Sequence, residues 1–480
     1  MTKTFQTIKN SAPMKIIAGF LASRFFPFIT AALIIACYYA SLDIVAIIYI
    51  GITGTLIFLL LDDVSPILTD LLFMSVFVSY KNTPNSGRGD SNYYLQPQIL
   101  APLCIIVAIL VASAVFRLVV LGVKKKFSFT PMFFGLCALS VTLIMNGVLG
   151  EKYYLLNLMF GFALSLIFLG LFAILKDNLV TDKNTFERIA LNFTAFSLLL
   201  VIELIVAYFT IDGIFTDGNV DRSKLVFGWG AYTQYGAYLV MCIPCVVYLA
   251  GKYKYGFPLT LYSFVLVIAS VMCFCRQAMV CTAVIYPVCL IILFIKGKNK
   301  LPNLIILAAA LIASIVVAGL YQDYMFKFFE TIFANIKIDG ELYGSGRMEL
   351  YRTALKHYKQ NPIFGIGFYY MTPSGGGKIG FSLVPQMYHN TILEMMGACG
   401  TFGLIAYLVH RALTVISYFR KITLERTFIA LTILSLLIVS LLDNHVFNIF
   451  PTMIYTYLIS VLVKSEDRKK PVKQAVLAAA

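Results

Sequence analysis

The sequence predicts an all-α integral membrane protein of about 12–14 transmembrane helices with one large extracytoplasmic loop. Of its 480 residues, 60% are hydrophobic and 13% are charged, whereas globular proteins carry about 25% charged residues. A water-soluble core cannot hide this much apolar surface. One long polar interval, Tyr321–Tyr388, interrupts the apolar runs. A long loop of this kind is either functional or disordered, and its aromatic residues, Gly-rich turns and candidate helix favour function.

We identify about fourteen candidate spans, taking roughly 17–25 apolar residues as a full crossing and allowing shorter runs. In chain order they are Phe26–Ala40, Leu42–Leu61, Pro66–Tyr80, Pro97–Leu121, Phe129–Leu149, Tyr154–Leu175, Ala190–Thr210, Ala231–Ala250, Phe257–Cys275, Gln277–Ile295, Pro302–Leu320, Asn390–His410, Phe428–Leu442 and Val446–Val463. This divides the chain into helices 1–11 in residues 1–320, the extracytoplasmic loop in 321–388, the last three helices in 389–463 and a cytoplasmic tail in 464–480.

Basic residues predict the orientation, because Lys and Arg collect in cytoplasmic loops. Six basic segments alternate with poorer loops: Lys124–Lys126, Lys176–Arg188, Lys252–Lys254, Lys296–Lys300, Arg411–Arg426 and Lys464–Lys473. Placing all six inside requires an even number of spans and cytoplasmic N- and C-termini. The outer face then receives Lys81–Tyr94, Asp212–Gly230, the Cys275–Arg276 turn, the long loop and Asp443–His445. The polar residues of interest therefore gather on one side.

Charge and cysteine usage exclude several function classes. The net charge of +15 reflects topology first, so we expect no nucleic-acid partner, while anionic headgroups or an anionic lipid-linked substrate remain possible. All ten cysteines fall in or beside apolar runs, where thiols act as small hydrophobes. Cys242 and Cys245 form a CxxC without a second pair at metal-ligand spacing, which favours core packing over zinc or redox chemistry. We therefore expect no metal site.

The long loop contains a predicted amphipathic helix from Arg347 to Lys359. Apolar residues recur at three- and four-residue steps, Ser345 is a candidate N-cap, and Asn361–Pro362 ends the helix. Arg347 then lies at a helix N-terminus, where anions bind. Gly365, Gly367 and Gly375–Gly377 are predicted to form a flexible segment that closes over a substrate.

Three residues are the main functional candidates. Arg276 lies between two apolar runs, where it is either a snorkelling arginine or a functional group at membrane depth. Arg347 is either solvated and paired with a neighbouring glutamate or part of an anion site. His389 opens an apolar span and titrates near pH 6.5 when unperturbed, so it is a candidate general base, with a satisfied interfacial histidine as the alternative.

Further polar residues are weaker candidates. Asn390 follows His389, and Glu394 lies about one turn below it. His445 in Asp443-Asn444-His445 could orient His389 or bind a sugar. His357 and His410 are less favoured, and Asp62-Asp63, which resembles a metal-binding diacid, is interpreted as a solvated turn on the inner side.

Taken in order, three motifs resemble the O-antigen ligase and O-antigen polymerase superfamily. They are Cys275-Arg276-Gln277-Ala278, then Gly346-Arg347-(x)3-Tyr351 continuing to Pro362, Gly365 and Gly367, then His389-Asn390-(x)2-Leu393-Glu394 followed by Gly400 and Gly403. Phe227–Tyr232 and the span after it also look like that family, so the resemblance covers roughly Phe227 to Val463. The chain departs from the family at two of these motifs. The family often has tryptophan where this chain has Tyr351, and Ser-Arg-Gly where it has Cys275-Arg276-Gln277.

The resemblance implies a GT-C-like, inverting and metal-independent membrane glycosyltransferase that needs no cofactor. Its donor would be an undecaprenyl-diphosphate-linked glycan at the outer face of the bacterial cytoplasmic membrane, and its acceptor a glycan, lipid or protein. Arg276 and Arg347 would bind the diphosphate and His389 would accept the acceptor's proton, with Asn390, Glu394, His445 and Tyr351 as orienting or acceptor-binding residues. Other polysaccharide-assembly membrane proteins are potential partners.

The sequence leaves several functions open. Polymerase and ligase use the same donor, and only the number of spans favours polymerase. A flippase or transporter of lipid-linked oligosaccharide is the main alternative, although the chain lacks the two similar halves usual in transporters. Glu203 within a span would suggest ion coupling, with an interhelical hydrogen bond as the competing interpretation. A purely structural scaffold would not need two arginines and a histidine on one face.

Overall fold

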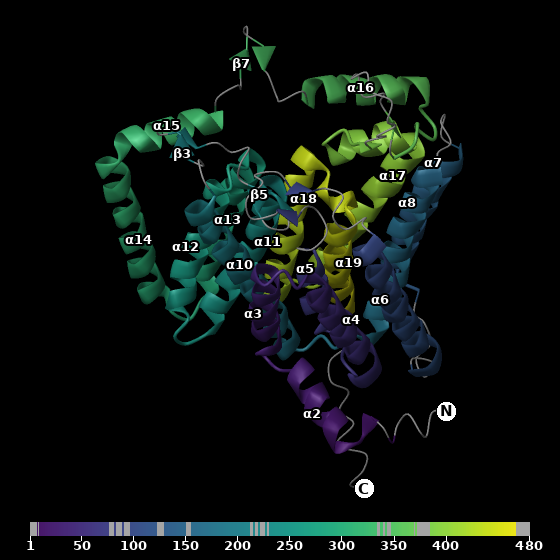
Figure 1. Cartoon of the computed structure of the whole chain (residues 1–480). Helices are drawn as coiled ribbons and strands as arrows, with labels where there is room; N and C mark the ends of the chain where they lie inside the picture. Colours follow the sequence, from purple (N-terminus) through teal and green to yellow (C-terminus); the bar gives the residue numbers. More distant parts are fainter. Residues whose placement is uncertain are drawn as a thin grey trace.

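The computed structural model is built almost wholly of α-helices, and this confirms the predicted all-α membrane fold (Figure 1). It describes residues 7, 9–75, 81–82, 89–90, 97–121, 129–149, 155–211, 215–216, 219–220, 226–227, 230–333, 337–338, 341–342, 347–368, 370–371 and 385–466. The predicted cap Ser345, the Gly375–Gly377 run, the Lys124–Lys126 cluster and most of the tail lie outside these residues.

The long helices follow one another along the chain. They are α2 (Ala12–Leu21), α3 (Phe26–Tyr39), α4 (Asp43–Leu60), α5 (Ile67–Met74), α6 (Pro97–Phe116), α7 (Pro131–Leu149), α8 (Leu155–Ser165), α9 (Phe172–Asn178), α10 (Lys183–Thr210), α11 (Tyr232–Lys252), α12 (Phe257–Met272), α13 (Arg276–Lys296), α14 (Lys300–Leu320), α15 (Gln322–Phe333), α16 (Arg347–Gln360), α17 (Thr391–Phe419), α18 (Leu424–Asp443) and α19 (Ile449–Lys464). The π-helical segments η2 (Arg117–Leu121) and η3 (Leu166–Leu171) and the 3-10 turn η4 (His445–Phe447) interrupt or link them.

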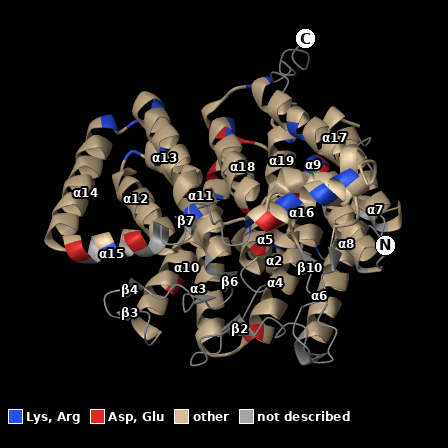
Figure 2. Cartoon of the chain, turned by 90° about the horizontal axis from the view of Figure 1, so that it is seen from above, with Lys and Arg blue, Asp and Glu red and all other residues tan. Residues whose placement is uncertain are grey.

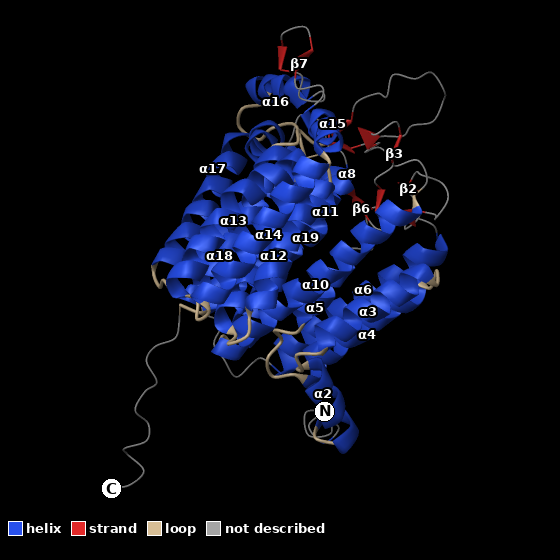
Figure 3. Ribbon diagram, turned by 90° about the vertical axis from the view of Figure 1, so that its left-hand side faces the viewer, coloured by secondary structure: helices blue, strands red, loops and turns tan. Residues whose placement is uncertain are grey.

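Strands in the described residues form only two-residue antiparallel pairs. These are β1 (Lys81–Asn82) with β2 (Gly89–Asp90), β3 (Phe215–Thr216) with β4 (Asn219–Val220), β5 (Val226–Phe227) with β6 (Gly230–Ala231), β7 (Lys337–Ile338) with β8 (Glu341–Leu342), and β9 (Tyr370–Met371) with β10 (Pro385–Gln386). Figure 3 shows β7 beyond the helical bundle and β2, β3 and β6 toward the same end.

Each of the predicted spans overlaps a described helix. Nine helices among the described residues are long and apolar enough to cross a membrane, and α2 with α3 form a pair bent by 83° that passes the same test together. Three further apolar helices are shorter: Pro131–Asn146, Phe257–Met272 and Ile449–Lys464. The run predicted over Pro66–Tyr80 contains only the eight-residue α5, whose side chains are buried from Ile67 to Phe73.

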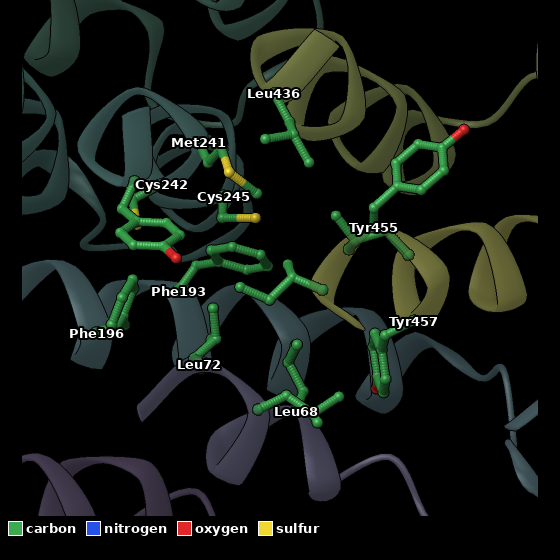
Figure 4. Packing of buried hydrophobic residues seen from close by; sticks show 14 of the residues in the cluster. Leu68, Leu72, Phe193, Phe196, Met241, Cys242, Cys245, Leu436, Tyr455 and Tyr457 are labelled. Carbon is green, nitrogen blue, oxygen red and sulfur yellow. The ribbon is translucent and has the colours of Figure 1, made fainter. Parts of the chain in front are cut away.

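The interior of the bundle is packed by helices α5, α10, α11, α18 and α19. Figure 4 shows Phe193 and Phe196 of α10 beside Cys242 and Cys245 of α11. All four are at most 2% exposed. The cysteines are free thiols, and eight of the ten are buried, so the CxxC pair packs in the core. Because α11 is buried over 89% of its span, it forms the central helix against which the others pack.

The two ends of the bundle differ in what they carry. Helices α15 and α16 and strand β7 lie over one end, which we call the loop end, and helix α2 lies at the opposite end, which we call the terminal end (Figure 1). Figure 2 looks onto the loop end and shows blue basic positions along α16 above the tan bundle. The even number of crossings and the orientation of the bundle stay predictions, and the predicted orientation makes the loop end the outer one.

Candidate functional site

The site is built around the last turn of α18 at the loop end. The final carbonyl groups of a helix have no partner within the helix and must be capped. Thr391 donates from Oγ1 to Ser440 O (2.7 Å), Asn390 from Nδ2 to Leu441 O (2.7 Å), and Arg347 from Nη1 to Leu442 O (2.7 Å). Three consecutive carbonyls thus draw the starts of α16 and α17 onto the end of α18.

Asp443, the last residue of α18, is the centre of this arrangement. Its Oδ1 lies 2.5 Å from His389 Nδ1, and its Oδ2 lies 3.4 Å from Gln277 Nε2 and 3.8 Å from Arg347 Nη2. His445 Nε2 is 3.6 Å from the same Oδ2. One mostly buried carboxylate, 15% exposed, therefore faces donors from four different parts of the chain.

His389 is placed so that one ring nitrogen is fixed and the other is accessible. Its Nδ1 contacts Asp443, and its side chain is 44% exposed. With Nδ1–H donated to the carboxylate, Nε2 carries the lone pair. In the described part of the chain Nε2 makes no hydrogen bond. The ring can therefore accept a proton at Nε2 while Asp443 stabilises the resulting cation.

The backbone at His389 is strained and is held in place from below. His389 has φ of 52°, which is uncommon for a residue other than glycine and marks a constrained turn. The preceding N–H of Tyr388 donates to Glu394 Oε2 at 2.8 Å, and Glu394 is fully buried. Asn390 caps α17 by accepting from Ile392 N and Leu393 N. Asn390 and Glu394 thus fix the turn that presents His389.

Arg347 begins α16 and reaches down to α18. Its Nη1 caps Leu442 O, as described above, and its side chain is 26% exposed. A guanidinium has five donors, and within the described residues the other four make no hydrogen bond. Tyr351 is half-buried one turn further along α16. Arg347 is therefore both a helix cap and a cation with donors available to an anion.

Arg276 is the first residue of α13 and lies at the same end of the bundle. Its side chain is half-buried. The adjacent Gln277 donates from Nε2 to Leu442 O at 3.3 Å, the carbonyl that Arg347 also caps. The start of α13 is therefore tied to the same turn as Arg347, and this brings the three main candidate residues to one part of the fold.

Two glycines of the predicted flexible segment are instead fixed against α17. Ile366 N donates to Gly397 O and Gly367 N to Ala398 O, both at 3.0 Å. Helix α17 breaks at Gly400, whose φ is 65°, and a Cβ at Gly365 would lie 2.3 Å from Ala398 O. The loop after α16 therefore satisfies the backbone of the broken helix, so the expectation of a closing segment is wrong for Gly365 and Gly367.

Helix α16 is anchored at both of its ends, on α18 at its start and on α17 and the turn before it at its C-terminal end. Besides Arg347 at its start, His357 Nδ1 lies 2.6 Å from Tyr388 Oη, and Tyr358 Oη lies 3.0 Å from Thr401 Oγ1. Tyr388 is fully buried. His357 thus supports the turn before His389 without facing the site. His410 is buried in α17 against Tyr455, 2.9 Å away, which fits its weaker ranking.

His445 occupies the short turn η4 behind the carboxylate. It is 3% exposed, and burial is the main cause that lowers the pKa of His445 below its usual range. Its Nε2 has no hydrogen-bond partner within the described residues, and Asp443 Oδ2 is the carboxylate oxygen it faces. A neutral imidazole here can restrain the second oxygen of Asp443.

The sequence analysis did not single out Asp443 or Gln277. Asp443 entered only as part of the triplet around His445, and an acid at the end of an apolar span was the available signal. Gln277 stood in the motif around Arg276 but was assigned no role, because its contacts lie with the end of another helix. Elsewhere, Glu203 of α10 is buried and its Oε1 has no hydrogen-bond partner within the described residues, so both ion coupling and an interhelical bond stay predictions.

The inner diacid is divided between two structural contacts. Asp62 pairs with Lys9 at 2.6 Å and is 93% exposed, while Asp63 pairs with Arg188 at 2.5 Å. A solvated turn therefore describes Asp62, whereas Asp63 is a half-buried ion pair. In the part of the chain that the structure describes, no group of three or more His, Cys, Asp or Glu side chains is arranged to hold a metal ion.

Comparison with known proteins identifies the family of the central segment. Residues 261–408 match the family model described as O-antigen ligase, which confirms the resemblance found in the sequence and is consistent with a member of the O-antigen ligase and polymerase superfamily. The match includes Arg276, Arg347 and His389 and ends before Asp443 and His445. No curated protein matches the chain. The family indicates glycan transfer of the ligase or polymerase type by a multi-pass membrane protein.

Proposed function

We propose that the protein polymerises undecaprenyl-diphosphate-linked oligosaccharide repeats of a surface polysaccharide at the outer face of the cytoplasmic membrane. The observation that carries the proposal is the Asp443 cluster, in which a half-exposed His389 bonded to a carboxylate stands beside Arg347 and the start of α13. The same cluster serves a ligase, in which the acceptor is a lipid or protein. A flippase does not need a base and a cation that face the same carboxylate, as His389 and Arg347 face Asp443. Transport is therefore the weaker alternative.

The proposed reaction is an inverting displacement at the anomeric carbon of the donor sugar. The acceptor hydroxyl oxygen attacks that carbon, the bond from the carbon to the phosphate oxygen breaks, and the diphosphate leaves with the electron pair. The hydroxyl proton passes to His389 Nε2, and Asp443 balances the charge that forms on the ring. The leaving group is already an anion and needs no proton. In this role a metal-free site suffices, because cations can stabilise the departing charge.

Arg347 and Arg276 are assigned to the diphosphate. Each guanidinium offers paired donors that match phosphate oxygens, and Arg347 keeps donors that are unused within the described residues. The N-terminus of α16, where Arg347 stands, favours an anion as well. Asn390 and Glu394 position the His389 turn, His445 positions Asp443, and Tyr351 on the same helix as Arg347 is an acceptor-side candidate.

Reconstituted transfer tests the proposal. Purified protein receives an undecaprenyl-diphosphate-linked oligosaccharide without nucleotide or metal, beside His389→Ala. We expect released undecaprenyl diphosphate and a ladder of longer lipid-linked chains that the variant does not make. A single transfer that requires an added lipid or protein acceptor would identify a ligase instead. Movement of the intact donor across a bilayer without turnover would overturn the enzyme assignment and leave a transporter.

A further inference from the structure

The lipid-facing surface directly below the site is formed by α13 and α18. On α13, Arg276, Val280 and Val284 follow at steps of four and share one face of the helix. Val280 is 54% exposed and Val284 50% exposed. On α18, Leu434 and Leu441 are two turns apart on one face and are 43% and 38% exposed. Each stripe ends at the loop end, beside a residue of the site.

Direct contacts between α13 and α18 show that the two stripes lie on either side of the line where these helices meet. Cys281 Sγ donates to Ser435 O at 3.5 Å, and Gln277 Nε2 to Leu442 O at 3.3 Å. Each contact joins residues adjacent in sequence to members of the stripes. We call the surface of Val280, Val284, Leu434 and Leu441 the α13–α18 seam. It runs from the lipid-exposed middle of both helices up to Arg276 and Asp443.

Helices α17 and α19, which also begin near the site, each expose one large apolar side chain in the first turn rather than a continuous stripe. In α17, Ile392 is 38% exposed, but no large apolar side chain between it and Phe402 is exposed, and Tyr358 of α16 is hydrogen-bonded to Thr401 on this part of the helix. In α19, Ile449 is 37% exposed, Phe450 and Met453 are half-buried, and the large side chains from Ile454 to Val463 are buried. A lipid chain that starts at the arginines therefore meets exposed apolar helix surface on α13 and α18.

We propose that the isoprenoid chain of the lipid-linked donor lies along the α13–α18 seam, an inference that rests on the proposed function. The first isoprene unit is bonded directly to the diphosphate, so the chain must leave the site within one helical turn of the groups that bind the phosphates. Arg276 heads the seam on α13, and Arg347 is bonded to the last turn of α18. Val280 and Val284 have short side chains, so this part of the α13 surface leaves room for a branched hydrocarbon beside the helix.

Chain-length dependence tests the seam without relying on overall activity. Val284 lies about 12 Å along the helix axis from Arg276, beyond the reach of a single isoprene unit. Two donors carry the same glycan diphosphate, one on a long polyprenyl chain and one on a single isoprene unit. We expect Val284→Trp to raise KM for the long-chain donor about tenfold and to leave kcat/KM for the short one unchanged. Val141→Trp, on a valine of α7 that is 52% exposed, is the matched control and should change neither.

Equal loss with both donors, or no loss with the long one, would overturn the seam assignment. A photoreactive polyprenyl diphosphate without sugar supplies a readout that needs no turnover. We expect it to label peptides of α13 and α18, and labelling confined to other helices would also overturn the proposal. If the wild-type protein transfers glycan from neither donor but is labelled in the seam, the proposed function fails and the lipid site stands.

Discussion

Arginines cap helix ends at both ends of this bundle, but they are satisfied to different degrees. At the terminal end, Arg117 makes four hydrogen bonds, to Phe58 O, Leu61 O, Asp62 O and Asn178 Oδ1. At the loop end, Arg347 makes one. A buried charge is stable only when its donors are paired, and Arg117 meets that condition. The partly paired Arg347, at 26% exposure, leaves capacity for an anion from outside the protein.

The same contrast separates the acids. Asp63 pairs with one cation, Arg188, and accepts from Ser65 and Val180 close by. Asp443 instead faces two histidines, an arginine and a glutamine. The first arrangement fixes a helix end and nothing more, whereas the second places a half-exposed titratable ring on the carboxylate. Polar contacts at the terminal end thus stabilise the fold, and those at the loop end also support chemistry.

Replacing His389, in the turn before α17, and His410, within α17, should give the largest contrast between an effect on the transfer rate and an effect on stability. His389→Gln removes the base and should slow transfer by about 10²–10⁴-fold, with little change in melting temperature because the ring is 44% exposed. His410→Gln, at a buried histidine bonded to Tyr455, should lower the melting temperature and spare kcat. Initial rates and thermal unfolding in detergent measure both. Wild-type turnover by His389→Gln would remove its assignment as base.

Asp443 and Asp63 should show the same contrast, with one substitution lowering kcat and the other lowering stability. Asp443→Asn removes the charge that stabilises protonated His389, so kcat should fall about 10²-fold or more at saturating donor. Asp63→Asn breaks the Arg188 pair and should cost about 1–3 kcal/mol of unfolding free energy without changing kcat. If Asp443→Asn alters only stability, Asp443 is a structural cap rather than a positioning residue.

Arginine-to-lysine changes should give a smaller effect. Arg347→Lys keeps the charge but loses the planar fork, so kcat/KM should fall by about 10²-fold or less. Arg117→Lys should leave kcat/KM unchanged and lower stability, because one ammonium cannot reproduce four directed bonds. Steady-state rates on lipid-linked donor and thermal unfolding distinguish the two. Equal transfer by Arg347→Lys and wild type would assign Arg347 to capping alone.

The sequence predicts the helices and the main candidates but not how they are joined. Apolar run length predicted a helix in each of the fourteen runs, because a bilayer imposes a length on apolar segments, although the run over Pro66–Tyr80 contains only the eight-residue α5. His389, Arg276 and Arg347 were found through their residue types at the ends of polar motifs. Asp443 matters through a carboxylate that four segments approach, and Gln277 through its bond to the end of α18, and no local sequence pattern records such contacts. The sequence shows glycines at 365 and 400, but it does not show why glycine is needed there. The structure shows that tight backbone contacts, rather than flexibility, require it.

His445 gives the smallest expected effect and the sharpest test of positioning. His445→Phe removes the donor that faces Asp443 Oδ2 and should lower kcat several-fold, whereas His445→Gln retains an amide donor and should recover most of it. A merely structural role would move stability in both variants without this order in kcat. Pairing each rate with a melting temperature separates the two explanations.

The pH dependence of stability provides an independent readout at the same residue. Burial lowers the pKa of His445, so the native protein takes up this proton at a lower pH than the unfolded chain, which is protonated below about pH 6.5. Stability contributed by this residue therefore falls as the pH drops below that value, by up to about 1.4 kcal/mol per pH unit. Asp443, His389 and Arg347, which face His445, are common to wild type and variant. His445→Gln should consequently lose less stability than wild type between pH 7 and 5.5, and equal losses would show that His445 is already protonated in the folded protein.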